Sequence, residues 1–370
     1  MHDALILGGG VIGLSLAYEL AGQGRAVRVI DRGQPGRGAS WAGAGILPPA
    51  ALRESDSAYE QLVGMSHELH PRWSAQLREE TGIDNGYRRC GGILVARDAA
   101  SAAALENEAK RLVSESIDIR RLDGACLAEL EPALAAGTVQ LAYHLPDKAQ
   151  LRNPRHLKAL LAACTARGVD VMPGVAAEDF RVRSGRVEAV ETNLGAMAAH
   201  QVCLTSGCWS GALTRRLGWS LGVKPIRGQM VLLANHRPVL KQIIGLGKQY
   251  IVARPDGRVL AGSTEDDVGF DDRTTAAGVT GLLQLALSLV PALSEARVER
   301  TWAGLRPASA DGLPYLGRLP DLDNVWVATG HFRGGLQQSP ATAVVMRQAI
   351  CGQPTDVELQ ALRPDRANDE

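Results

Sequence analysis

The order of the first thirty-one residues constrains this chain more than any other feature. A short apolar run, Asp3–Leu7, meets a segment with the pattern GxGxxG, Gly8–Gly13. Leu14–Ala21 then carries apolar residues at helical spacing, and Arg25–Ile30 is typical of a second buried strand. Asp31 ends that strand, eighteen residues after the last glycine of the motif. This order predicts a strand, a tight turn, a helix and a second strand, as at the start of an α/β domain.

Each residue of this pattern has a physical role in binding a dinucleotide. Gly8 permits the tight turn, Gly10 removes the Cβ that would hold a pyrophosphate away from the backbone, and Gly13 lets the helix pack close to the sheet. The helix N-terminus offers unpaired N–H groups and a positive dipole end to the phosphates. Asp31 is placed to accept hydrogen bonds from ribose hydroxyls. The motif does not distinguish NAD from FAD, and a glycine-rich turn in an ordinary α/β protein is the structural alternative.

Length and composition narrow the class of protein. A chain of 370 residues is expected to form two domains. Lys and Arg together number 40, as do Asp and Glu, and aromatic residues make up 4%, so we expect neither a nucleic-acid partner nor an anionic membrane surface. No apolar run approaches the length of a membrane span, and no basic leader precedes the first strand.

The cysteines carry no spacing typical of a metal site. They show no CxxC pair and lie at Cys90, Cys126, Cys164, Cys203, Cys208 and Cys351. Scattered cysteines of this kind are typical of reduced thiols in a cytoplasmic protein, so we expect a cytoplasmic location and no metal.

Helix–strand units of the nucleotide-binding type recur at the start, the middle and the end of the chain, and strand-rich segments interrupt them. The expected helices include Ser57–Thr81, which Pro71 should kink or split, and one capped by Asn153. Phe180–Thr192 and Ala199–Leu204 are interpreted as hairpin strands, and Arg297–Thr301 as a short strand. The pattern predicts a mixed α/β fold with a discontinuous Rossmann-like domain, residues 1–80, 145–215 and 300–370, and an inserted antiparallel-sheet domain, residues 81–144 and 216–299.

Two further segments are candidates for contact with a nucleotide. A strand that ends in Thr205-Ser206-Gly207 before a helix is a second place where backbone can approach a ligand, so Gly207 is a cofactor candidate. The small residues of Trp41–Pro49 suggest backbone pressed against a large flat ligand, although composition alone favours a plain loop.

Three stretches together resemble a known family. These are GGGVIG with its following VID, AGIL within GASWAGAGIL, and TWAGLRPASADGLPYLGRLP followed by VATGHFRGGLQQSPAT. The chain resembles the glycine oxidases of the ThiO type, which are FAD-dependent amine oxidases of the D-amino acid oxidase family. The similarity covers about residues 3–350 and is densest from Trp302 to Thr342.

The resemblance implies FAD held without a covalent bond. Related sarcosine oxidases attach flavin to a cysteine in the region corresponding to residues 307–315, where this chain has none. Residues that match positions along the phosphates, ribose, adenine side and isoalloxazine ring are Val11, Ile12, Asp31, Arg32, Ala39, Ser40, Ala44, Gly45, Ile46, Val175, His331, Phe332, Arg333, Gly334, Gly335, Leu336 and Gln337.

The resemblance also implies a substrate site. Arg306 matches the arginine that pairs with the substrate carboxylate, Tyr250 a tyrosine whose hydroxyl assists it, and Arg333 a substrate-contacting position. A guanidinium can meet a carboxylate with two parallel hydrogen bonds, which fixes the α-carbon. The structural alternatives are a salt bridge for Arg306, a half-buried strand residue for Tyr250 and a loop cap for Arg333. This chain differs from the family pattern at Ile46, Pro48, Gly245, Lys248 and Gln249. We expect these differences to affect the size of the substrate and the affinity for it, and less the reaction.

The reaction implied by the resemblance is oxidation of glycine or another small amine. The α-hydrogen passes as hydride to the flavin, the imine hydrolyses to a 2-oxo acid such as glyoxylate, and dioxygen reoxidises the flavin with release of hydrogen peroxide. In the family the imine feeds thiazole synthesis for thiamine. The alternatives are a sarcosine or D-amino acid oxidase or dehydrogenase of another preference, a flavin-binding module without turnover, and an NAD dehydrogenase. The oligomeric state stays open, a homo-oligomer included.

Overall fold

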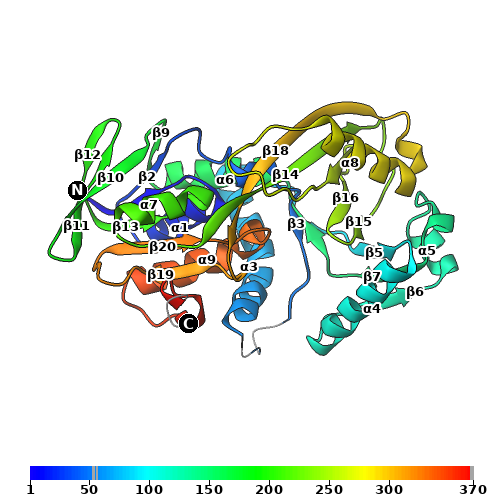
Figure 1. The fold of residues 1–370 in the computed structure, drawn as a ribbon, viewed down its shortest axis with the longest axis horizontal. Helices are drawn as coiled ribbons and strands as arrows, with labels where there is room; N and C mark the ends of the chain where they lie inside the picture. Colours follow the sequence, from blue (N-terminus) through cyan, green and yellow to red (C-terminus); the bar gives the residue numbers. More distant parts are fainter. Residues whose placement is uncertain (52–54, 56, 367–370) are drawn as a thin grey trace.

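The fold is organised around two large β-sheets. It is described from a computed structural model, which describes residues 1–51, 55 and 57–366. Figure 1 shows the two sheets side by side, with the two chain ends in the same half of the molecule and the long strands β14 and β18 reaching across. The mixed α/β class predicted from the sequence is confirmed.

The first sheet contains the predicted nucleotide-binding strands. Its six strands lie in the order β19-β20-β13-β1-β2-β9, and all neighbours are parallel except β19 and β20. Their bounds are β1 His2–Leu7, β2 Val27–Asp31, β9 Asp170–Pro173, β13 Ala199–Leu204, β19 Tyr315–Arg318 and β20 Val325–Thr329. The carboxyl ends of β1, β2 and β13 therefore meet at one edge, where open α/β sheets bind ligands.

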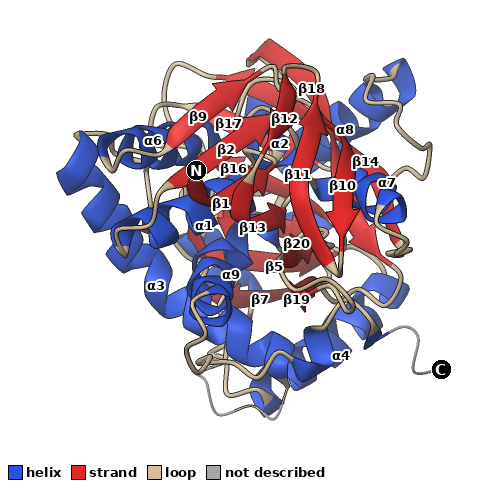
Figure 2. Ribbon diagram, turned by 90° about the vertical axis from the view of Figure 1, so that its left-hand side faces the viewer, coloured by secondary structure: helices blue, strands red, loops and turns tan. Residues whose placement is uncertain are grey.

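Helices cover this sheet because their apolar side chains need burial. The helices are α1 Val11–Gly22, α3 Ala58–Thr81, α6 Asn153–Ala166, α7 Ser210–Arg216 and α9 Gly335–Ile350. Figure 2 shows α3, α6 and α9 gathered on one side of the strands. Leu14, Leu62 and Leu160 from three of these helices are fully buried in one core, and each such side chain contributes about 1.5–3 kcal/mol.

The second sheet is mostly antiparallel. Its eight strands lie in the order β18-β14-β17-β16-β15-β5-β7-β6, and only the β15–β5 pair is parallel. The strands are β5 Gly92–Ala96, β6 Arg120–Leu122, β7 Leu141–Leu145, β14 Val223–Ala234, β15 Ile243–Leu246, β16 Gln249–Ala253, β17 Arg258–Gly262 and β18 Arg297–Ser309. The accompanying helices are α4 Ala99–Ser114, α5 Gly124–Leu130 and α8 Ala276–Leu289. One face packs on α8 in a separate apolar core, which leaves the opposite face for a ligand.

Smaller elements complete the fold. One three-stranded sheet consists of β10 Ala177–Arg183, β11 Arg186–Thr192 and β12 Gly195–Met197, and another of β3 Ile46–Leu47, β8 Ala149–Gln150 and β4 Arg88–Arg89. Short helical turns are α2 Ala39–Ala42, η1 Ala136–Thr138, η2 Gly207–Trp209, η3 Pro291–Leu293 and η4 Gln360–Leu362.

Several local predictions were wrong. The predicted hairpin within Phe180–Thr192 exists, but Ala199–Leu204 is β13, which lies parallel to β1 because its apolar side chains fill both faces of the buried sheet. The strand expected to end at Thr301 continues to Ser309 along β14. Of the two effects expected of Pro71, a kink or a split, the split is absent: helix α3 is continuous through this residue, since its packing against α6 and α9 outweighs one lost hydrogen bond.

The start of α6 also differs from the prediction. Arg152, and not Asn153, is the N-cap residue, and Asn153 is already helical. The Asn153 side chain donates to the carbonyl oxygen of Ser40 at 2.6 Å. This residue therefore joins α6 to α2, where the sequence predicted only a helix cap.

Candidate active site

A cavity of about 1030 Å³ is lined by the edge of the first sheet and by one face of the second. It brings together almost every residue that the sequence proposed. The lining includes Gly8, Gly10, Val11, Ile12, Asp31, Arg32, Ala39, Ser40, Ala44, Gly45, Ile46, Val175, Gly207, Tyr250, Arg306, His331, Phe332, Arg333, Gly334, Gly335, Leu336 and Gln337. Gly13 does not line it, so its contribution is indirect.

The turn between β1 and α1 has no room for side chains on its inner side. Gly8 has a φ of +118°, and a Cβ there would lie 2.7 Å from the carbonyl oxygen of Thr205. A Cβ at Gly13 would lie 2.0 Å from the carbonyl oxygen of Gly8. At Gly10 the nearest atom to such a Cβ is the Ser40 hydroxyl at 3.3 Å. The turn is thus close-packed below and open toward the cavity, as a bound pyrophosphate requires.

Asp31 organises the loops on either side of this turn. One carboxylate oxygen accepts from the Gly9 amide at 2.8 Å, and the other accepts from the Gly33 amide at 2.8 Å. A carboxylate has further lone pairs, so Asp31 can still accept from ribose hydroxyls. The Arg32 guanidinium carbon lies 3.6 Å from the centroid of the Trp209 ring. Trp209 also lines the cavity, and sequence reasoning missed it because nothing in its local pattern relates it to Arg32.

The loop containing Ala39–Ile46 is pressed against β18 and not only against the cavity. The Trp302 indole donates to the carbonyl oxygen of Ala42 at 3.0 Å. A Cβ at Gly304 would lie 2.4 Å from the Ala42 side chain. The buried Arg254 guanidinium donates to the carbonyl oxygen of Ala44 at 2.6 Å. These contacts explain why small residues are needed here even before a ligand is considered.

The segment before α9 forms another wall of the cavity. Phe332 has a φ of +46°, which is rare outside glycine, and its amide donates to the carbonyl oxygen of Pro307 at 2.9 Å. His331 is buried, and burial lowers the pKa of its imidazole to about 3. His331 is therefore neutral at physiological pH, and its Nε2 lies 3.2 Å from the Thr342 hydroxyl.

Arg306 projects from β18 over Gly228 of the neighbouring strand. A Cβ at Gly228 would lie 2.1 Å from Arg306 Nη2, so only glycine leaves space for the guanidinium. Arg306 donates to the Ser263 hydroxyl at 2.6 Å and to the carbonyl oxygen of Thr264 at 3.2 Å. Burial lowers the pKa of the guanidinium, and the nearby Tyr250 phenol opposes that shift.

The charge of Arg306 is left without an acidic partner. Within the described residues no carboxylate lies within ion-pair distance of it, whereas the buried Arg227 pairs with Asp266 at 3.1 Å and with Asp271 at 3.2 Å. The salt-bridge alternative for Arg306 is therefore not what the structure contains. A half-buried guanidinium that faces a cavity without an acid can bind a carboxylate with two hydrogen bonds.

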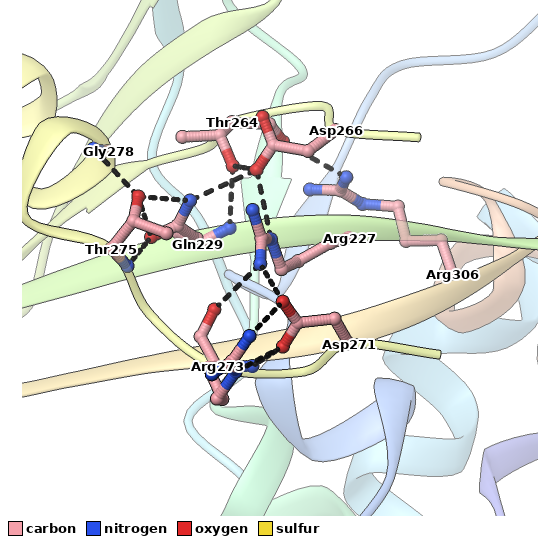
Figure 3. Close-up of polar contacts among 9 residues, drawn as sticks. All are labelled: Arg227, Gln229, Thr264, Asp266, Asp271, Arg273, Thr275, Gly278 and Arg306. Atoms are coloured by element: carbon pink, nitrogen blue, oxygen red, sulfur yellow. Dashed lines mark hydrogen bonds and ion pairs between the residues drawn. The ribbon is translucent and has the colours of Figure 1, made fainter. Parts of the chain in front are cut away.

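A polar network behind Arg306 holds one of its two acceptors, Thr264 (Figure 3). Asp266 accepts from Thr264 Oγ1 at 2.8 Å, from Gln229 Nε2 at 3.0 Å and from Arg227 Nε at 3.1 Å. These bonds attach the segment after β17 to β14 and hold the Thr264 carbonyl near Arg306. This network could not be predicted from the sequence, because its members are separated by up to about forty residues and meet only in the folded sheet.

Tyr250 and Arg333 lie on the wall nearest Arg306. The Tyr250 hydroxyl lies 3.4 Å from the sulfur of Met230. Arg333 pairs with Glu265 and donates to the carbonyl oxygen of Lys248 at 3.3 Å. Glu265 also accepts from the Lys248 ammonium at 2.6 Å, and hydrogen bonds from Lys248 and Arg333 hold the pKa of its carboxyl below the usual value. Arg333 is therefore less free than Arg306 to take a new anion.

No group of three or more His, Cys, Asp or Glu side chains among the described residues is arranged to hold a metal ion. Every helix within the described ranges is too short or too polar to cross a membrane.

Comparison with known proteins identifies the family of this chain. Over residues 3–349 the sequence matches the family described as FAD dependent oxidoreductase. It is 35% identical over 357 residues to the glycine oxidase of Pseudomonas putida, covering 95% of this chain and 94% of that protein. It is 33% identical over 359 residues to the bifunctional protein ThiO/ThiG of Trichormus variabilis, covering 96% of this chain and 53% of that protein.

Solved structures agree with the sequence comparison. The crystal structure of glycine oxidase from Geobacillus kaustophilus superimposes with a TM-score of 0.92 at 33% identity, covering 99% of this chain and 98% of that one. The resemblance inferred from the motifs is confirmed, and with it the dependence on FAD. This chain belongs to the family of FAD-dependent oxidoreductases that includes the glycine oxidases.

Proposed function

We propose that this protein oxidises glycine and other small amino acids or amines, using FAD and dioxygen. The observation that carries the proposal is the unpaired Arg306 guanidinium, which faces the same cavity as the Gly8–Gly13 turn and the segment before α9. Both the relative from Pseudomonas putida and the solved Geobacillus structure are named glycine oxidase, which supports glycine as substrate.

The residues of the cavity have separate roles in this proposal. Arg306 binds the substrate carboxylate, and the Tyr250 hydroxyl assists it, so the α-carbon is held in one position. Ile46 and Arg333 border the substrate. Bound FAD supplies the two-electron acceptor that dioxygen reoxidises, so the amine leaves as an imine that hydrolyses to a 2-oxo acid while hydrogen peroxide is released. No side chain has to remove a proton from carbon if the amine binds neutral.

The same proposal covers the cofactor residues and the wider setting. We propose that FAD contacts those residues predicted from the sequence that also line the cavity. Gly13 does not line it and contributes by letting α1 pack close to the sheet. The discontinuous cofactor domain and the inserted substrate domain are proposed with their predicted bounds, although the second sheet continues to Ser309. A role in thiamine biosynthesis is supported by the ThiO/ThiG relative, and a cytoplasmic location by six cysteines that form no disulfide.

The test is an assay of the purified, FAD-loaded protein. It should release hydrogen peroxide with glycine, sarcosine or D-alanine. Arg306→Ala should retain FAD and lose at least about 10²-fold in kcat/KM, since a positioned charge pair is removed. Arg297→Ala is the matched control, because this exposed arginine lies on the same strand. Oxidation of glycine by Arg306→Ala at wild-type efficiency would overturn the assignment. A substrate panel with and without oxygen distinguishes an oxidase from a dehydrogenase.

A further inference from the structure

Lys148 places a second cation in the cavity. It follows β7, is only 8% exposed and lines the same cavity as Arg306. Its aliphatic stem crosses Gly92, where a Cβ would lie 2.3 Å from Lys148 Cδ. Its ammonium ends near Gly245, where a Cβ would lie 3.9 Å from Lys148 Nζ. Gly92 thus provides the space in which the stem crosses the sheet, and the ammonium lies at ordinary contact distance from position 245 on the adjacent strand, where the closest atom to a Cβ would be Leu94 Cδ2 at 2.8 Å.

The Lys148 ammonium has no partner that matches its charge. Within the described residues no hydrogen bond or ion pair to Nζ is present. The groups that act on it from a distance are the Cys90 thiol and Glu108, which pairs with Arg111 at 2.7 Å. Burial lowers the pKa of Lys148 to about 8. A buried charge without a partner is costly, so an anionic ligand at this point would recover interaction energy.

The strand register sets the position of Lys148 relative to the proposed substrate site. Gly245 lies directly opposite Tyr250, and Tyr250 lies directly opposite Gly262. Opposed residues share a face, with Cβ atoms about 4.5–5.5 Å apart. Lys148 Nζ therefore lies on the same wall as the Tyr250 side chain, which in turn interacts with Arg306. The wall carries Arg306 on one side of Tyr250 and Lys148 on the other.

We propose that Lys148 binds a second carboxylate, so that this enzyme prefers amines that carry two carboxylates over their neutral-tailed analogues. This inference rests on the proposed function, because Arg306 must bind the carboxylate next to the reacting carbon. The second carboxylate then reaches past Tyr250 to the ammonium above Gly245. Iminodiacetate is a small achiral member of this class, and sarcosine is the analogue in which one carboxylate is replaced by hydrogen.

A binding experiment tests the site without turnover. FAD-loaded protein is titrated with thiodiacetate and with (methylthio)acetate, which differ by one carboxylate and carry no amine, and the flavin absorbance is followed. Wild-type protein should bind the diacid at least about tenfold more tightly, the effect expected of one charged hydrogen bond. Lys148→Met should remove that difference. Lys158→Met, at an exposed lysine of α6, should retain it.

Kinetics separate this inference from the proposed function. The ratio of kcat/KM for iminodiacetate to kcat/KM for sarcosine should fall at least about tenfold in Lys148→Met and stay unchanged in Lys158→Met. Equal binding of both thioethers by the wild type, or loss of FAD from Lys148→Met, would overturn the inference. If the diacid binds through Lys148 but no amine is oxidised, the proposed reaction fails and the second carboxylate site stands. If glycine is oxidised but Lys148 makes no difference between diacids and monoacids, the proposed reaction stands and the second carboxylate site fails.

Discussion

At the scale of single residues, the site depends on glycines, which leave space, as much as on the side chains that fill that space. Arg306 can lie over β14 only because position 228 is glycine. The sequence identified Arg306 and the glycines of the first turn, since local motifs carry them. It did not identify Gly228, Lys148 or Asp266, because their importance comes from neighbours across strands.

Gly228→Ala should impair substrate binding while the protein keeps its flavin. The new methyl group would overlap the Arg306 guanidinium, which must then move by about an ångström, and such a displacement costs on the order of 10²-fold in kcat/KM for glycine. Steady-state peroxide release and the flavin spectrum measure the two effects. Gly281→Ala is the control, because a Cβ at this position of α8 would meet no atom within 4 Å. Unchanged kinetics in Gly228→Ala would show that Arg306 need not occupy its present position.

Arg333→Ala should have a milder effect than a change at Arg306. Arg333 is about one-third exposed and already pairs with Glu265, so the loss of its charge should raise KM for glycine a few-fold and leave kcat nearly unchanged. Arg120→Ala removes a comparably paired but remote arginine and should leave both constants unaltered. A fall in kcat/KM as large as that expected of Arg306→Ala would show that Arg333 contributes as much as Arg306 to holding the substrate.

At the scale of elements, α3 and α6 meet through two buried histidines. His70 Nε2 donates to the carbonyl oxygen of Gln337 at 2.9 Å, and His156 Nδ1 accepts from Asn85 at 3.1 Å. Burial lowers the pKa of His70 to about 4 and that of His156 to about 3. Both are therefore neutral in the folded protein at physiological pH.

These histidines should make the free energy of unfolding pH-dependent. Below the ordinary histidine pKa of about 6.5, these two histidines bind protons in the unfolded chain but stay neutral in the folded chain. Their contribution to the free energy of unfolding is therefore present above that pH and is lost as the pH falls toward 4. Between pH 6.5 and 5 the two groups together should lower the free energy of unfolding by about 3 kcal/mol. Urea unfolding at both pH values measures this loss. His156→Gln should reduce the pH slope, and the exposed His200→Gln should not; equal slopes in all three proteins would contradict the account.

The sequence predicted elements well where local signals are strong and less well where pairing is distant. The β1–α1–β2 unit follows from the glycine-rich turn and the apolar periodicity that lie within the segment itself. The parallel placement of β13 beside β1 could not be read locally, since the two strands are separated by almost two hundred residues. The length of β18 likewise depends on β14, which provides its hydrogen bonds.

At the scale of the whole molecule, the cavity joins the two sheets. Residues from both line it, so a dinucleotide bound there contacts both and stabilises only the folded chain. Free FAD at about a hundredfold above its Kd should add about 2.7 kcal/mol to the free energy of unfolding and raise the Tm. Differential scanning fluorimetry of stripped protein with FAD or FMN measures this shift. FMN lacks the adenosine half, and an equal shift with FMN would contradict a cofactor extended to Asp31 and Val175.

The central claim is that a small amino acid, held by Arg306, reduces FAD in this cavity. The most direct measurement is the visible absorbance of the FAD-loaded protein mixed with glycine in the absence of oxygen. The account predicts that the oxidised flavin bands bleach in the wild type and return when air is admitted, while Arg306→Ala stays oxidised over the same time. A wild-type flavin that stays oxidised with glycine, sarcosine and D-alanine alike would contradict it.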